Sequence, residues 1–65
     1  MWVIREEKTK KYYKELLTDM VGGKIPSYTS NLQEAMLFET LEAEEEYRML
    51  HIVWTNTQPF EIPEP

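Results

Sequence analysis

Residues 40–54 read TLEAEEEYRMLHIVW and decide the fold, because they hold the most regular hydrophobic pattern in the chain. Four apolar side chains recur at intervals of four, three and four residues: Ala43, Tyr47, Leu50 and Trp54. At ~100° per residue this spacing places all four within a stripe of about 60° on one side of a helix. Thr40 suits the N-cap, and the helix dipole favours glutamates in the first turn. The segment predicts an amphipathic helix from about Leu41 to Trp54, with this stripe facing the core.

The end of this helix has two readings. A helix leaves Ile52 and Val53 off the apolar stripe, whereas residues 51–54 (HIVW) also suit a strand. We expect the helix to continue to Trp54. The stretch TNTQP then ends it, and the residues FEI form a last short strand before Pro63.

The N-terminal third predicts a β-hairpin. Strand-forming residues occupy Met1–Glu6 and Lys11–Leu16, and the intervening EKTK supplies the turn. Gly22–Lys24 is the clearest break in the chain, and KIPSYT after it predicts a third strand. Because Pro26 cannot donate to a ladder, this strand should lie at an edge of the sheet.

Between these strands and the helix, Ser30 and Gln33 have the spacing of a capping box. Leu32, Ala35 and Met36 then form one or two helical turns that close an end of the core, and Phe38 returns the chain to an extended form. The whole chain, residues 1–65, is predicted to be one small α+β domain. Its antiparallel sheet packs against one C-terminal amphipathic helix, with Tyr47, Leu50 and Trp54 against the sheet.

Composition narrows the class of protein. Sixty-five residues, 42% of them hydrophobic, are enough to fold, but the chain has no cysteine for a disulfide or a thiolate metal site. No apolar run approaches the ~20 residues of a membrane-spanning helix, and no signal sequence is evident. We expect a soluble protein of the cytoplasm that has no membrane partner.

Two stretches of the chain, WVIREEKTKKYY and TSNLQEAMLFETLEAEEE, follow a recurrent pattern. In this pattern the chain resembles small accessory proteins of phages and prophages of Gram-positive bacteria, most of which have no assigned activity. Matching positions in the second stretch are Thr29, Leu32, Glu34, Ala35, Phe38 and Thr40. The chain departs from the pattern at Lys10, where a hairpin glycine is usual, and at Ala43, which falls one place early. The resemblance implies an accessory protein that acts in the host cell.

Charge is divided between the two halves. Residues 1–30 carry six basic and four acidic side chains, giving +2, and residues 31–65 carry one basic and eight acidic side chains, giving −7. The glutamates of the helix are, in the simplest interpretation, its solvated face, with Glu44 paired to Arg48 four residues on. The functional hypothesis is an acidic face that covers a larger host or defence protein, on a basic surface. Its residues are Glu42, Glu45, Glu46, Met49 and Val53. Alternatively, a second copy of the chain could bury the two apolar residues of this face, Met49 and Val53, in a homodimer.

The alternative hypothesis is a nucleic-acid-binding hairpin. Lysines beside aromatic side chains on a sheet hold single strands by charge and stacking. The residues of this hairpin would be Lys8, Lys10, Lys11, Tyr12, Tyr13 and Lys14. Interrupting glutamates and the net charge of −5 disfavour this alternative, and half-buried tyrosines covered by lysine stems are the simpler interpretation.

Catalytic chemistry has little basis in these residues. His51 is the single histidine, and no cysteine or nearby serine accompanies it. The segment GGK lacks the spacing and the hydroxyl residue of a phosphate-binding loop. Solvent-facing glutamates do not form a carboxylate pair with differing environments. The sequence predicts a protein that is not an enzyme and has no cofactor or metal site.

Overall fold

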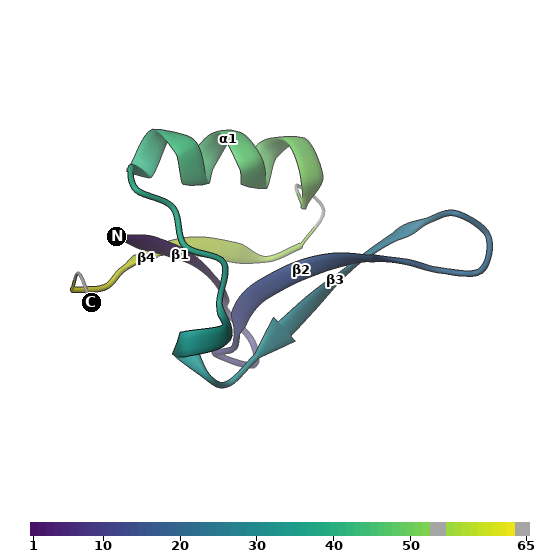
Figure 1. The fold of residues 1–65 in the computed structure, drawn as a ribbon, viewed down its shortest axis with the longest axis horizontal. Helices are drawn as coiled ribbons and strands as arrows, with labels where there is room; N and C mark the ends of the chain where they lie inside the picture. The colour runs from purple at the N-terminus through teal and green to yellow at the C-terminus, as the bar shows by residue number, and fades with distance from the viewer. Residues whose placement is uncertain (53–54, 64–65) are drawn as a thin grey trace.

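Four antiparallel strands and one α-helix make up the fold of residues 1–52 and 55–63, the part of the chain that the computed structural model describes (Figure 1). The strands are β1 (Trp2–Glu6), β2 (Tyr12–Thr18), β3 (Lys24–Thr29) and β4 (Thr57–Glu61). The helix α1 (Leu41–His51) lies across one side of the sheet, and a short 3₁₀ turn, η1 (Leu32–Glu34), precedes it. Strand order is β3-β2-β1-β4. The predicted α+β class, hairpin, third strand and terminal strand are confirmed.

Strand β1 is central but its two sides are paired unequally. It pairs with β4 along its whole length, from Trp2 opposite Glu61 to Glu6 opposite Thr57. Its pairing with β2 is confined to Arg5 opposite Tyr12. The sheet therefore opens into a β1–β4 ribbon and a β2–β3 hairpin, which projects from the rest of the molecule (Figure 1).

The segment before the helix closes this opening. Met36 N–H donates to the Tyr13 carbonyl at 3.0 Å, and Phe38 and Trp2 exchange two backbone hydrogen bonds of 2.8 Å. The prediction that Phe38 returns to extended backbone is confirmed. The predicted cap is off by one residue, since Asn31 and not Ser30 accepts from Gln33 N–H, at 3.0 Å. The Asn31 carboxamide lies two residues from that N–H, which forms an Asx turn that competes with the capping box.

A proline interrupts each outer edge of the sheet. Ile62 N–H donates to the Met1 carbonyl, and antiparallel alternation from that pair points the backbone of Pro59 away from β1. The same alternation, starting from Asp19 N–H and the Gly23 carbonyl, points the backbone of Pro26 away from β2. Each proline therefore sits at a position whose backbone faces the unpaired edge of the sheet, so its missing N–H costs no hydrogen bond within the sheet. The edge position of β3 is confirmed, and neither edge offers an unbroken row of donors to another strand.

Consecutive residues of β1 serve two separate cores. Val3 and Ile4 are both fully buried and point to opposite faces of the sheet. Val3 joins Ala35 and Ile62, with Leu32 of η1 packed against them. On the other face, Ile4 joins Tyr13 and the C-cap residue Ile52, with Tyr47 of α1 packed against them.

The helix is rotated from the orientation that its apolar pattern predicts. Thr40 is the N-cap as expected, with its hydroxyl accepting from Ala43 N–H at 3.1 Å. The buried side is formed by Glu44, Tyr47 and the C-cap residue Ile52, whereas Ala43 is exposed and Leu50 is 68% exposed. The predicted inward positions of Ala43 and Leu50 are therefore wrong, although that of Tyr47 is confirmed.

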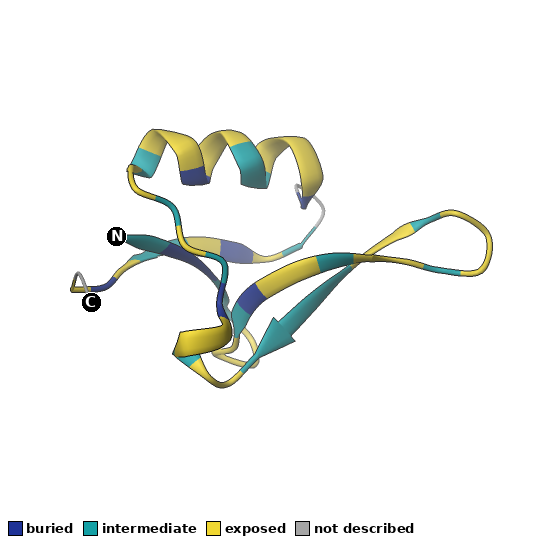
Figure 2. Cartoon of the chain, viewed as in Figure 1, coloured by how far each residue is buried: buried dark blue, intermediate teal, exposed yellow. Residues whose placement is uncertain are grey.

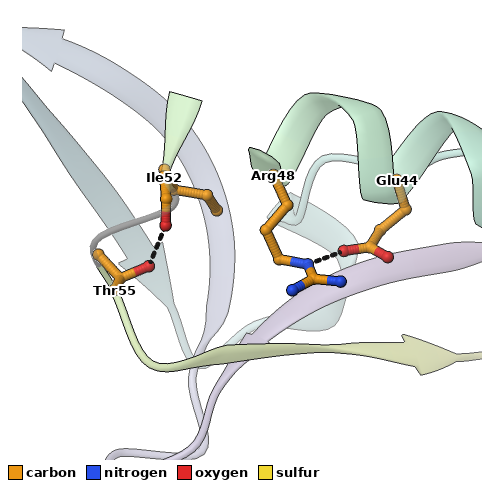
Figure 3. Close-up of polar contacts among 4 residues, drawn as sticks. All are labelled: Glu44, Arg48, Ile52 and Thr55. Carbon is orange, nitrogen blue, oxygen red and sulfur yellow. Dashed lines mark hydrogen bonds and ion pairs between the residues drawn. The ribbon is translucent and has the colours of Figure 1, made fainter. Parts of the chain in front are cut away.

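Two polar contacts lie on the buried side of the rotated helix. Glu44 and Arg48 pair beneath the helix, and the Tyr47 hydroxyl forms a hydrogen bond with Tyr13 of β2. The helix ends at His51, and Thr55 Oγ1 donates to the Ile52 carbonyl at 2.8 Å (Figure 3). His51 is therefore helical and Ile52 is the C-cap, in neither helix nor strand, so the predicted continuation of the helix is wrong at Ile52. Val53 and Trp54 lie outside the described residues.

The turn of the first hairpin contains a left-handed residue. Lys10 has φ of 61°, the one positive φ among the described residues other than glycine. Its N–H donates to the Glu6 carbonyl at 3.0 Å, and Glu6 N–H donates to the Lys11 carbonyl at 2.8 Å. A side chain in this conformation costs free energy that glycine does not.

We expect Lys10→Gly to stabilise the protein, because glycine removes the left-handed penalty of this turn. The free energy of unfolding should rise by about 0.5–1 kcal/mol, measured by urea denaturation. Lys8→Gly, in the same turn but without a positive φ, is the matched control and should lower stability or leave it unchanged. Equal effects of the two substitutions would contradict this account of Lys10.

Candidate interaction surfaces

The outer side of α1 carries the acidic face that the sequence predicts. The side of α1 away from the sheet is exposed (Figure 2). The exposed residues of this helix include Glu42, Glu45, Glu46 and Met49. Leu50, which sequence analysis placed in the core, lies on this outer side too. Val53, the fifth predicted residue, lies outside the described residues. The surface therefore combines three carboxylates with two large apolar side chains that are 62% and 68% exposed, Met49 and Leu50.

Beneath the helix, Glu44 and Arg48 form an ion pair that points toward the sheet (Figure 3). Arg48 Nε donates to Glu44 Oε1 at 2.6 Å. The predicted pairing is confirmed, but Glu44 is fully buried and the Arg48 side chain is only 21% exposed. Glu44 Oε2 has no hydrogen-bond partner within the described part of the chain. Burial raises the pKa of Glu44 above its ordinary value, and Arg48 opposes this shift only in part.

A tyrosine cluster joins the β2–β3 hairpin to α1. The hydroxyls of Tyr13 and Tyr47 lie 2.7 Å apart, and the Tyr28 ring packs edge-on against Tyr13 with centroids 6.2 Å apart. Burial of Tyr13, together with its hydrogen bond to Tyr47, raises the pKa of its hydroxyl. Burial also raises the pKa of Tyr28. These tyrosines are structural contacts of the core.

This placement removes the stacking platform from the nucleic-acid hypothesis. Tyr13 is fully buried, and Tyr12 is half-buried with its ring 6.1 Å from that of Phe60. A base cannot stack on Tyr13 without opening the core, so the role suggested for that residue is wrong. The four lysines of the hypothesis are exposed in the turn between β1 and β2 and at the start of β2: Lys8, Lys10, Lys11 and Lys14.

A small cavity lies between α1 and the segment that precedes it. Its volume is about 260 Å³, and its lining comprises Phe38, Ala43, Glu46, Tyr47, Leu50 and His51. The Phe38 and Tyr47 ring centroids are 5.4 Å apart, and those of Tyr47 and His51 are 4.5 Å apart. Three neighbouring aromatic rings thus form part of one wall, and Glu46 brings a carboxylate to the same cavity. No pattern in the sequence indicates this cavity, because Phe38 reaches the helix only through tertiary packing.

The tip of the β2–β3 hairpin is an apolar projection. Met20 and Val21 are almost completely exposed. Asp19 Oδ1 holds the turn by accepting from the N–H groups of Val21 at 3.0 Å and Gly23 at 2.6 Å. A side chain at position 23 would place Cβ 2.7 Å from the Asp19 carboxylate, so this carboxylate would have to shift to admit it. In the sequence, Gly22 and Gly23 mark only a break between strands. The apolar residues just before them, Met20 and Val21, were the available signal for an exposed apolar tip.

Within residues 1–52 and 55–63, no group of three or more histidine, cysteine or acidic side chains is arranged to hold a metal ion. The same part of the chain has no helix with the length and apolar character needed to cross a membrane.

Comparisons with models of protein families, with characterised proteins and with solved structures found no match to this chain. The resemblance to phage accessory proteins therefore stays a prediction.

We expect Glu44→Gln to remove a pH-dependent loss of stability. Because the pKa of Glu44 is raised above 4.5, the folded chain binds more protons than the unfolded chain as the pH rises from that value. Stability contributed by this residue is therefore present at lower pH and is lost as the pH rises through the folded-state pKa. Glutamine keeps an acceptor for Arg48 and does not ionise. Urea unfolding of both proteins from about pH 4 to about pH 8 measures the difference.

Glu45→Gln provides the control for that experiment, because Glu45 is exposed on the same helix. Its stability should follow the wild-type pH dependence. A wild type that gains stability relative to Glu44→Gln as the pH rises would show that pairing with Arg48 outweighs burial.

We expect Arg48→Met to be strongly destabilising near pH 7, by about 3–5 kcal/mol, because it leaves a buried carboxylate without its cation. The cost should shrink at acid pH, where Glu44 is neutral. Circular dichroism during thermal unfolding at two pH values checks both statements. An equal cost at both would contradict the burial of a charged Glu44.

Proposed function

We propose that this chain is a non-enzymatic interaction protein that covers a basic surface of a larger protein with the outer face of α1. The observation that carries the proposal is the composition of that face. Exposed carboxylates of Glu42, Glu45 and Glu46 accompany Met49 and Leu50, two large apolar side chains that the fold leaves in solvent. An apolar centre with a charged rim is the usual anatomy of a protein–protein interface.

The mechanism is occlusion. Acidic side chains steer the chain toward a basic patch and set its orientation, and burial of the apolar pair retains it there. A partner whose own ligand needs that patch is then blocked sterically and electrostatically. The resemblance to phage accessory proteins supports a host or defence protein as the target, in the host cytoplasm.

The rest of the structure is consistent with a role in binding to protein. Nucleic acid is the less favoured ligand, because the exposed helix face is acidic and Tyr13 is buried. Prolines on both outer strands oppose self-association by strand addition, which leaves the helix face as the surface for a second copy in the homodimer alternative.

The test is capture of the partner by the full chain from a lysate of Gram-positive cells. The proposal expects one stoichiometric basic protein that is released by salt. Replacing Glu42, Glu45 and Glu46 together by lysine should abolish its capture, since the reversed charges repel the same patch. These positions are exposed, so circular dichroism should show that the variant stays folded.

A matched control separates the helix face from the other exposed apolar surface. Met20→Ser combined with Val21→Ser alters only the hairpin tip and should leave capture unchanged. Capture that survives the triple lysine variant and is lost in the tip variant would refute the acidic face. Light scattering of the purified chain decides the homodimer alternative, which requires a stable dimer without any partner.

A further inference from the structure

We propose that the cavity between α1 and Phe38 binds the guanidinium group of an arginine in a basic segment of the partner protein. The inference rests on the interaction role proposed above and names the chemistry that the helix face recognises. It concerns the cavity lined by Phe38, Ala43, Glu46, Tyr47, Leu50 and His51.

The aromatic wall is the first reason. Phe38, Tyr47 and His51 all line the cavity, and their rings are tilted by 53° and 47° to their neighbours, so they are not stacked face to face. Cations are attracted to aromatic faces within about 6 Å, and arginine is the side chain that stacks on them most often. The chain already shows this contact elsewhere, where the Arg5 guanidinium carbon lies 4.5 Å from the centroid of the Phe60 ring.

Charge complementarity is the second reason. Glu46 lines the cavity, and no ion pair involving it is found in the described residues. Glu42 lies one helical turn before it and is exposed. Arg48 is turned beneath the helix toward Glu44, so its charge is already paired (Figure 3). The cavity therefore has a negative rim, which favours a cation over an anion. Arginine can also offer a planar fork to the Glu46 carboxylate while its face lies on a ring.

Size is the third reason. A volume of about 260 Å³ is below the roughly 300–1,000 Å³ of pockets for drug-sized ligands and cofactors. It suits a single long side chain. Because the cavity borders the outer face of α1 through Glu46 and Leu50, a peptide that crosses this face can insert one arginine into it.

The experiment titrates isotope-labelled full-length protein with a hexa-arginine peptide and follows backbone amide resonances. The inference expects saturable shifts centred on residues 43–51 and Phe38. Glu46→Gln should weaken binding about tenfold, because it removes the rim carboxylate. Ala43→Leu should weaken it by a similar factor, because its larger side chain fills the cavity without changing charge. The matched control is Glu15→Gln on β2, which removes the same charge from an exposed position outside α1 and the cavity and should have less than about a twofold effect.

Other outcomes overturn the inference in distinct ways. Equal effects of Glu46→Gln and Glu15→Gln, with none from Ala43→Leu, would show a diffuse attraction between charges without a cavity site. Hexa-lysine binding as tightly as hexa-arginine would remove the assignment to guanidinium. Light-scattering dimers that Ala43→Leu dissociates would make a second copy the occupant.

Failure of the cavity site is distinguishable from failure of the proposed function. If Ala43→Leu still captures the partner while the triple lysine variant does not, the acidic face acts without the cavity. If both variants capture the partner as the wild type does, the proposed function is wrong as well.

Discussion

Two-sided burial of β1 is the constraint from which the rest of the structure follows. A chain of 65 residues without disulfides has little apolar surface to bury, and two of its fully buried side chains, Val3 and Ile4, are consecutive residues of β1. Val3 needs a cover on one face, supplied by Ala35 and Ile62, and Ile4 needs a cover on the other, supplied beneath α1. The edges of β1 are covered as well, by β4 on one side and by β2 and Phe38 on the other.

This arrangement frees the β2–β3 hairpin from the centre of the sheet. Since Phe38 occupies the place beside Trp2, β2 meets β1 only near Arg5 and then diverges. The hairpin ends in a turn held by Asp19, with Met20 and Val21 in solvent. Its base stays attached to the core through Tyr13, whose hydroxyl meets that of Tyr47. Tyr13, which the nucleic-acid hypothesis assigned to base stacking, thus joins the β2–β3 hairpin to α1.

Orientation of α1 connects the fold to the proposed function. A helix whose buried side includes an ion pair must place other residues outside, and here these include Leu50. A buried pair is a weak source of net stability, because desolvation offsets most of its attraction. The orientation of the pair also affects the surface, since Met49 and Leu50 are left exposed on the outer side of α1. The same rotation brings Tyr47 and His51 beside Phe38 and leaves Glu46 at the cavity they line.

Local signals in the sequence determined the elements and their order. Proline and glycine positions, strand-forming runs and the Thr40 cap predict each strand and the start of the helix, because these signals act over a few residues. The outward direction of Glu42, Glu45 and Glu46 followed from the same helix. Tertiary structure alone decided that Glu44 is buried and Leu50 is exposed, because a stripe of apolar residues cannot foresee a hydrogen bond to Tyr13 from a distant strand. It also decided the aromatic cavity, because Phe38 and α1 meet there only through tertiary packing. The left-handed Lys10 belongs to a local turn, but that turn contains no glycine to mark the conformation in the sequence.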